Sequence, residues 1–169
     1  MKLNAALRLR AYSQNQIFYR GLTQSWSDEH AKKQHIIFIT PDKDYALEYA
    51  KDAQHVLEFH ADLGQSFNFG FRTLQTEVQL AEVLDRVKRG VLSQFQEHKI
   101  SREKGMELMD ELSDIKGSGY KHVWEWYMQL PALVKILKAA GYDSVEGAEG
   151  TNDDIPTYGV FSVSQLKRV

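Results

Sequence analysis

The chain has 169 residues, a formal net charge of −2, and hydrophobic and charged fractions of 43% and 26%. These proportions are typical of a globular protein with one hydrophobic core, and they exclude an intrinsically disordered chain. Cysteine is absent and the six histidines show no metal-binding spacing, so disulfides and cysteine nucleophiles are excluded and no metal is expected.

No apolar run approaches the roughly 18 to 20 residues that a bilayer-spanning helix requires, so we expect no membrane partner and a cytoplasmic location. The near-neutral charge disfavours a nucleic-acid partner but leaves room for a local basic patch. We expect a single domain over residues 1–169, because no linker, repeat or low-complexity segment interrupts the chain.

The first quarter of the chain predicts a short helix and two strands. Leucines and alanines at helical spacing indicate a helix within residues 3–12, and aromatic and β-branched residues that run into a glycine indicate a strand over 16–21. A polar loop is expected over 23–34. The β-rich segment 35–40 is then the second predicted strand.

Two tyrosines lie on one face of the next predicted helix. Pro41 and Asp42 turn the chain, and Tyr45 and Tyr49 follow with a spacing of four residues. Residues at this spacing are neighbours on a helix surface, so both rings should point the same way.

The middle of the chain predicts further strands and a helical insertion. Residues 55–63 indicate a third strand, and Phe67, Phe69 and Phe71 alternate as in a half-buried strand. Apolar residues then step by three or four along a long amphipathic helix, and Ser101 is a candidate N-cap of a second helix. The insertion spans about 76–116.

The last part of the chain predicts a helix and two strands. The helix begins at Pro131 and ends before Gly141, which suits the residue after a helix C-terminus. Residues 142–145 indicate a strand, 146–156 a polar loop, and 158–163 the final strand.

Three segments, in this order, resemble the ADP-ribosyltransferase superfamily, and the diphtheria-toxin and poly(ADP-ribose) polymerase branch in particular. The segment 18–21, Phe-Tyr-Arg-Gly, resembles that branch's strand ending in His-Gly, with arginine in place of histidine. The segment 38–49 is similar to the family's aromatic-x-small stretch followed by a helix and a second aromatic. The segment 157–166 is similar to its closing Glu-Tyr-x-Val-Tyr-x-x-x-Gln strand. The junction 141–145 resembles that of small bacterial and phage members.

The resemblance implies an α+β fold, an ADP-ribosyltransferase-like split β-sandwich with a helical insertion, and NAD as the substrate. It also implies a set of residues around the dinucleotide. These are Arg20, Gly21, Phe38, Thr40, Tyr45, Tyr49 and Thr157.

Elementary chemistry gives several of these residues a role. A flat nicotinamide ring stacks on an aromatic face such as Tyr49, and a backbone amide pair such as that of Gly21 holds its carboxamide. The pyrophosphate requires a cationic donor, which Arg20 supplies. The alternative interpretation is structural, with Arg20 in a surface ion pair and Tyr45 in core packing.

A carboxylate is expected to stabilise the positive charge that develops on the ribose, but threonine stands at position 157 where the family has glutamate. Asp154 and Asp153 lie three and four residues upstream, and either could restore the charge. The predicted catalytic residues are therefore Arg20, Tyr49, Asp154 and Asp153. Solvated loop charges are the plain alternative for both aspartates.

The leading hypothesis is a mono-ADP-ribosyltransferase, of a toxin or effector type, that modifies a protein or another macromolecular acceptor. The insertion 76–116 is the expected partner-reading element. One alternative is a catalytically inactive binding or inhibitor protein with the same fold. Another is a small toxin-like ribonuclease that uses His35, His55 and His60 as acid and base.

Overall fold

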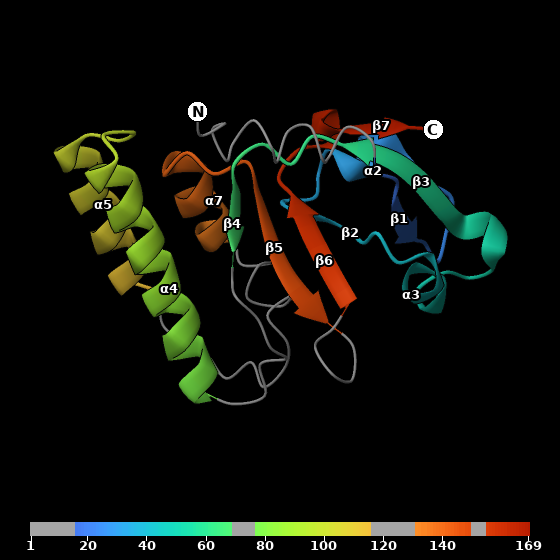
Figure 1. The fold of residues 1–169 in the computed structure, drawn as a ribbon, viewed down its shortest axis with the longest axis horizontal. Helices are drawn as coiled ribbons and strands as arrows, with labels where there is room; N and C mark the ends of the chain where they lie inside the picture. Colours follow the sequence, from blue (N-terminus) through green and yellow to red (C-terminus); the bar gives the residue numbers. More distant parts are fainter. Residues whose placement is uncertain (1–15, 69–76, 116–130, 150–154) are drawn as a thin grey trace, which may run out of the picture.

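The computed structural model describes residues 16–68, 77–115, 131–149 and 155–169, which form a mixed α+β arrangement of two sheets and a group of helices (Figure 1). The elements in chain order are β1 (Phe18–Gly21), α2 (Asp28–Ala31), β2 (Ile37–Ile39), α3 (Lys43–Glu48), η1 (Ala53–His55), β3 (Val56–Ala61), β4 (Ser66–Asn68), α4 (Glu77–Gln96), α5 (Arg102–Ser113), α7 (Pro131–Ala139), β5 (Ser144–Glu149), β6 (Ile155–Val160), η2 (Val163–Gln165) and β7 (Leu166–Arg168).

The two sheets meet along one edge of β1. The first sheet has the order β1-β3-β7 and is antiparallel throughout. The second has the order β2-β6-β5-β4, in which β4 and β5 are parallel and the other pairs are antiparallel. An antiparallel bridge between Tyr19 and Thr40 joins β1 to the chain just after β2. The strand that carries Arg20 therefore lies beside the end of β2.

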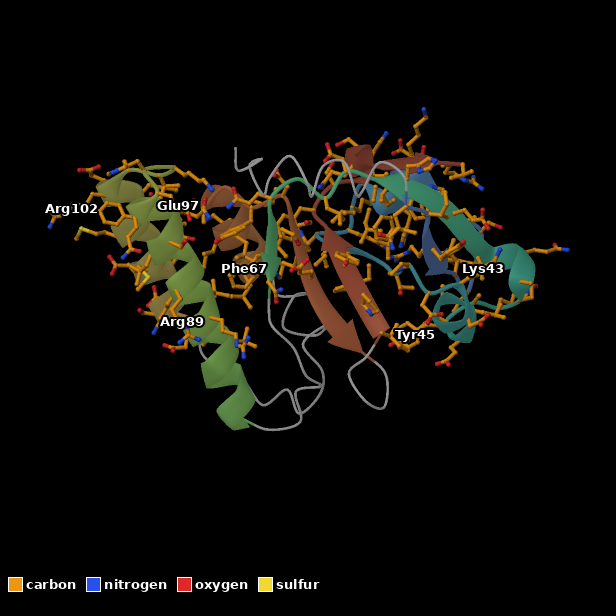
Figure 2. The ribbon with its side chains drawn as sticks, in the orientation of Figure 1. Lys43, Tyr45, Phe67, Arg89, Glu97 and Arg102 are labelled. Carbon is orange, nitrogen blue, oxygen red and sulfur yellow. The ribbon has the colours of Figure 1, made fainter. Side chains whose placement is uncertain are left out.

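The four-stranded sheet has a hydrophobic core on each face. On one face, buried residues from both sheets pack together, among them Phe18, Ile37, Ile39, Ala61 and Val160. On the other face, α4, α5 and α7 cover a larger cluster (Figures 1 and 2). In this cluster the ring of Phe67, a residue of β4, packs against α4 at Gly90. The strands of this sheet thus contribute to both cores.

Several predicted boundaries are confirmed together with their local causes. The Ser101 side chain accepts a hydrogen bond from the amide of Lys104 and caps α5, as expected of an N-cap serine. Helix α7 begins at Pro131, and Gly141 follows it with φ +95°, a conformation that favours glycine. The predicted insertion contains two helices, α4 and α5.

Three sequence predictions were wrong. The expected loop 23–34 contains the short helix α2, which Ser27 caps. The expected loop 146–156 is largely β-structure, since β5 extends to Glu149 and β6 begins at Ile155. The expected last strand 158–163 ends at Val160, and it is followed by η2 and by β7, an edge strand that the sequence did not indicate.

Other predictions fall outside the described residues. These are the helix within 3–12, the extended positions Phe69 and Phe71, and the loop aspartates Asp153 and Asp154. In the described part of the chain, none of the helices has the length and apolar character needed to cross a membrane.

Candidate functional site

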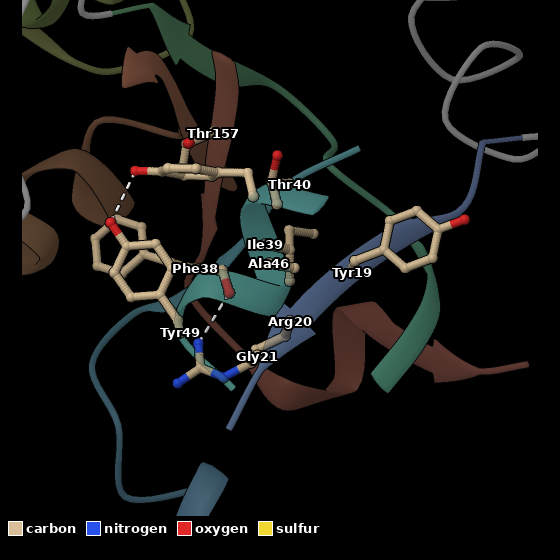
Figure 3. Close-up of a pocket in the computed structure, with 10 residues that line it drawn as sticks. Tyr19, Arg20, Gly21, Phe38, Ile39, Thr40, Ala46, Tyr49 and Thr157 are labelled. Carbon is tan, nitrogen blue, oxygen red and sulfur yellow. Dashed lines mark hydrogen bonds between the residues drawn. The ribbon is translucent and has the colours of Figure 1, made fainter. Parts of the chain in front are cut away.

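A pocket opens where the end of β1, the end of β2, helix α3 and the middle of β6 converge (Figure 3). It encloses a volume of about 190 Å³. All seven residues that the sequence assigned to dinucleotide binding line it, together with three that it did not assign. The lining residues are Tyr19, Arg20, Gly21, Phe38, Ile39, Thr40, Tyr45, Ala46, Tyr49 and Thr157.

Arg20 is held at the pocket by hydrogen bonds to β2 and to the segment that precedes it. Its Nη1 donates to the carbonyl oxygen of Phe38 at 2.9 Å (Figure 3), and its Nη2 donates to Oε1 of Gln34 at 3.3 Å. These bonds fix the plane of the guanidinium while the residue remains partly exposed. A fixed, partly exposed guanidinium is well suited to bind phosphate oxygens, because little side-chain freedom remains to be lost.

Gly21 is required by the close approach of helix α3 to strand β1. A Cβ atom at this position would lie 2.0 Å from the carbonyl oxygen of Ala46 and 2.9 Å from the carbonyl carbon of Tyr49. Both neighbours are backbone atoms, which cannot rotate away. The glycine therefore lets the end of α3 pack against β1 and brings Tyr49 next to Arg20.

The backbone of Gly21 also presents a donor and an acceptor toward the pocket side of β1. The amide of Tyr19 donates to the carbonyl of Thr40 at 2.7 Å, whereas the amide of Leu22 donates to the carbonyl of His55 on the β3 side. Backbone polar groups alternate between the two edges of an antiparallel strand. Those of Gly21 therefore point the same way as those of Tyr19, away from β3.

The two tyrosines of α3 have different surroundings. Tyr45 is buried, whereas Tyr49, the C-cap of α3, is 52% exposed. Their hydroxyl groups are hydrogen-bonded at 2.8 Å and their rings meet edge to face, with centroids 5.2 Å apart. Tyr45 thus anchors Tyr49, which keeps an exposed ring at the pocket.

Two buried threonines form the polar part of the wall. The Thr40 hydroxyl donates to the carbonyl of Pro156 at 2.8 Å and accepts from the amide of Asp42 at 3.1 Å. This ties the start of α3 to strand β6. Thr157 lies on β6 with only 3% exposure. Among the described residues that line the pocket, no side chain carries a negative charge.

A second pocket continues from the first along the segment between β1 and β2. It encloses about 310 Å³ and shares Arg20, Gly21 and Tyr49 with the first pocket. Its other walls are mostly polar, and they include the hydroxyl groups of Thr23, Ser25 and Ser27 and the ring of His30. The two pockets adjoin at these three shared residues, and we call them together the Arg20 cleft.

An ion pair joins helix α3 to strand β3 outside the pocket. Lys43 Nζ lies 2.8 Å from Oε1 of Glu58 and 5.4 Å from the centroid of the Tyr19 ring. The hydrogen bond to Glu58 raises the pKa of the Lys43 ammonium above its ordinary value. Lys43 is therefore charged at neutral pH and fastens the first turn of α3 to the sheet.

The structure brings together some of the sequence-assigned residues and separates others. The seven dinucleotide positions share the Arg20 cleft, but Asp153 and Asp154 lie outside the described residues. The three histidines lie on different elements. His35 precedes β2, His55 ends η1 and pairs with Asp52, and His60 lies on β3. Gln34, which holds Arg20, was missed because no local sequence pattern indicates its bond.

Compared with protein-family models, curated proteins and solved structures, the chain has no significant match. The geometry of the site and the motif resemblance therefore provide the support for a functional proposal.

Proposed function

We propose that the chain binds NAD in the Arg20 cleft and transfers a single ADP-ribose to a macromolecular acceptor, using an ADP-ribosyltransferase-like split β-sandwich. The supporting observation is that residues from three distant segments, chosen for their resemblance to that superfamily, line a single cavity. Arg20, Tyr49 and Thr157 are far apart in sequence and lie on different elements, so chance clustering on one helix or strand does not explain their meeting.

The pocket beneath Tyr49 fits the nicotinamide end of NAD. Its volume of about 190 Å³ accommodates an aromatic ring but not a whole dinucleotide. The exposed ring of Tyr49 offers a stacking face, and the backbone amide and carbonyl of Gly21 match the acceptor and donor of a carboxamide. Tyr45 fixes the position of the stacking ring through its hydroxyl group.

The adjoining pocket fits the remainder of the dinucleotide. Arg20 lies where the two pockets join, which is where the diphosphate of NAD would cross from one to the other. A guanidinium forms charge-assisted, bidentate hydrogen bonds to phosphate oxygens. The hydroxyl groups of Thr23, Ser25 and Ser27 provide partners for the adenosine ribose.

Transfer requires the C–N glycosidic bond of NAD to break. Nicotinamide leaves with the bonding electron pair, positive charge develops on the ribose, and an acceptor atom forms the new bond as it loses its proton. A carboxylate near the ribose stabilises this charge by a few kcal/mol in comparable reactions. Thr157 supplies none, so we assign this role to the loop before β6, with Asp154 ahead of Asp153.

The first experiment measures NAD binding by titration calorimetry and nicotinamide release by chromatography. We expect Arg20→Ala to lose about 1.5–3 kcal/mol of binding free energy, the worth of a charge-assisted hydrogen bond. Arg20→Lys should lose less because it keeps the charge. Arg168→Ala, an exposed arginine on β7, is the matched control and should bind as the parent does. Absence of NAD binding at millimolar concentration would overturn the proposal.

A non-catalytic binding protein is the second candidate, and the uncharged Thr157 favours it. The two candidates differ in whether nicotinamide is released from bound NAD. Replacing both loop acids, Asp153→Asn with Asp154→Asn, should abolish nicotinamide release by a transferase while NAD still binds. A parent chain that binds NAD but releases no nicotinamide would support the binding protein.

A further inference from the structure

A further cavity, larger than either pocket of the Arg20 cleft, adjoins that cleft and is not used by the proposed reaction. It is a groove of about 710 Å³ between helix α7 and the segment that joins α2 to β2. Both α2 and α7 can be located in Figure 1, with β6 between them. The floor includes the buried side chains of Val134 and Phe161. We call it the α7 groove.

Three lysines and one histidine line the α7 groove. Lys135 and Lys138 line it from α7, and Lys32 and His35 line it from the opposite side. Among the described residues that line the groove, none is acidic. The described lining thus offers three ammonium groups and no carboxylate to a bound molecule, on a chain whose formal net charge is −2.

Two of these lysines have acidic partners outside the groove, yet they remain open to solvent. Lys32 lies 3.3 Å from Glu29 and its side chain is 60% exposed. Lys135 lies 3.0 Å from Glu111 and its side chain is 69% exposed. Exposed pairs of this kind contribute little to stability. Lys32 can therefore turn toward a stronger anion in the groove at small cost, whereas Lys135 is held by both carboxylate oxygens of Glu111.

The lysines of α7 can contact one anionic chain together. Lys135 and Lys138 are three residues apart, so they lie on one face of α7. Their long, flexible stems let both ammonium groups reach phosphates of the same strand. Lys32 stands across the groove from them, where it can contact the same strand.

We propose that the α7 groove binds the phosphate backbone of a single-stranded nucleic acid. Lysine is a point charge that contacts phosphate without demanding a fixed geometry, and the described lining holds lysines and no arginine. The apolar floor accommodates sugar and base surfaces, which an acidic peptide lacks. Because Phe161 is 5% exposed, it offers no open stacking face, and recognition is independent of sequence.

The α7 groove shares a wall with the Arg20 cleft. Ala31 and Gln34 line both the groove and the second pocket of the cleft. A strand in the groove therefore lies beside the site proposed for NAD. Binding to the groove does not require NAD, so the two proposals stand or fall separately.

The test measures binding of a fluorescent 20-nucleotide single strand of mixed sequence by anisotropy, without NAD, from 50 to 200 mM salt. We expect Lys32→Gln with Lys138→Gln to weaken binding at least tenfold at the lowest salt. Each lost phosphate contact lowers the slope of log affinity against log salt by about 0.7 for a single strand, so the slope should fall by about 1.4.

The matched control is Lys104→Gln with Lys167→Gln, which removes the same charge elsewhere. Lys104 pairs with Glu107 three residues away, as Lys32 pairs with Glu29, and Lys167 is exposed on β7 as Lys138 is on α7. The control should bind within twofold of the parent. No binding at 50 mM salt, an equal loss in the control, or equally potent displacement by a polyglutamate peptide would each overturn the proposal.

Discussion

Gly21 illustrates how one residue can determine the site. Its hydrogen atom occupies the space in which any larger side chain would meet the backbone of α3. The sequence indicated that a glycine ended this strand, and the structure gives the reason, which is helix–strand contact. The same contact places Tyr49 beside Arg20, so packing and proposed binding depend on a single position.

Gly21→Ala should therefore destabilise the fold and weaken NAD binding together. We expect the free energy of unfolding to fall by about 1–3 kcal/mol, the usual cost of forcing extra volume into a packed site. Urea titration followed by circular dichroism measures this change. Gly105→Ala in α5 is the control, because its added Cβ would meet Phe95 Cβ of α4 at an ordinary 3.7 Å. That variant should be about 0.4–1 kcal/mol more stable. Equal behaviour of the two variants would contradict this account.

Tyr49→Ala should weaken both the fold and NAD binding, each by a modest amount. The Tyr49 ring is half exposed but packs edge to face on Tyr45, so the free energy of unfolding should fall by about 0.5–1.5 kcal/mol. NAD affinity should fall by about 0.5–1.5 kcal/mol, the worth of one aromatic contact. Tyr49→Phe loses the hydroxyl bond to Tyr45 but keeps the stacking face, so calorimetry should find it closer to the parent. Unchanged affinity in Tyr49→Ala would remove the ring from the site.

At the scale of elements, helices and strands could be predicted from the sequence where capping residues, proline, glycine or a long apolar period marked them. Helix α5 was predicted because Ser101 is a capping residue ahead of a long apolar period, and α7 because proline and glycine mark its ends. Helix α2 has four residues, too few to show a period. Strand β7 has three, two of them exposed, and it is held by pairing with β3 and not by its own pattern.

The site followed the same rule. Residues in recognisable motifs, such as Arg20 and Tyr49, could be assigned from the sequence. Gln34 could not, because its bond to Arg20 depends on how the segment before β2 lies against β1. The length of β5 and β6 was also missed. Their polar residues resemble a loop, and cross-strand pairing overrides that local preference.

Removing the α5 cap should cost a measurable part of the stability. Ser101→Ala leaves the amide of Lys104 without its side-chain acceptor, and we expect a loss of about 1 kcal/mol in the free energy of unfolding. Ser113→Ala is the control at the other end of the helix, where the hydroxyl donates to the carbonyl of Met109. Thermal denaturation should show a lower midpoint for Ser101→Ala and almost no change in the midpoint for Ser113→Ala. A larger drop in the midpoint for Ser113→Ala than for Ser101→Ala would contradict the stabilising role assigned to the Ser101 cap.

At the scale of the whole molecule, the four-stranded sheet couples two cores. Ile37 on β2 belongs to the core shared with the first sheet, and Val145 on β5 belongs to the core beneath the helices. The adjacent residue Phe38 packs against the second of these cores. A sheet with apolar contacts on both faces cannot lose one core and keep the other intact, because the same backbone hydrogen bonds support both.

The chain should therefore unfold in one cooperative transition, as expected of a single domain over residues 1–169. Leu133→Ala and Ile37→Ala each remove a fully buried side chain, one from each core, and each should lower the free energy of unfolding by about 2–5 kcal/mol. Urea unfolding followed by both far-ultraviolet circular dichroism and tryptophan fluorescence should give coincident curves for the parent and for both variants, since coincidence is the mark of two-state behaviour. Two separated transitions, with each variant shifting only one of them, would show that the helical layer and the Arg20 cleft fold independently.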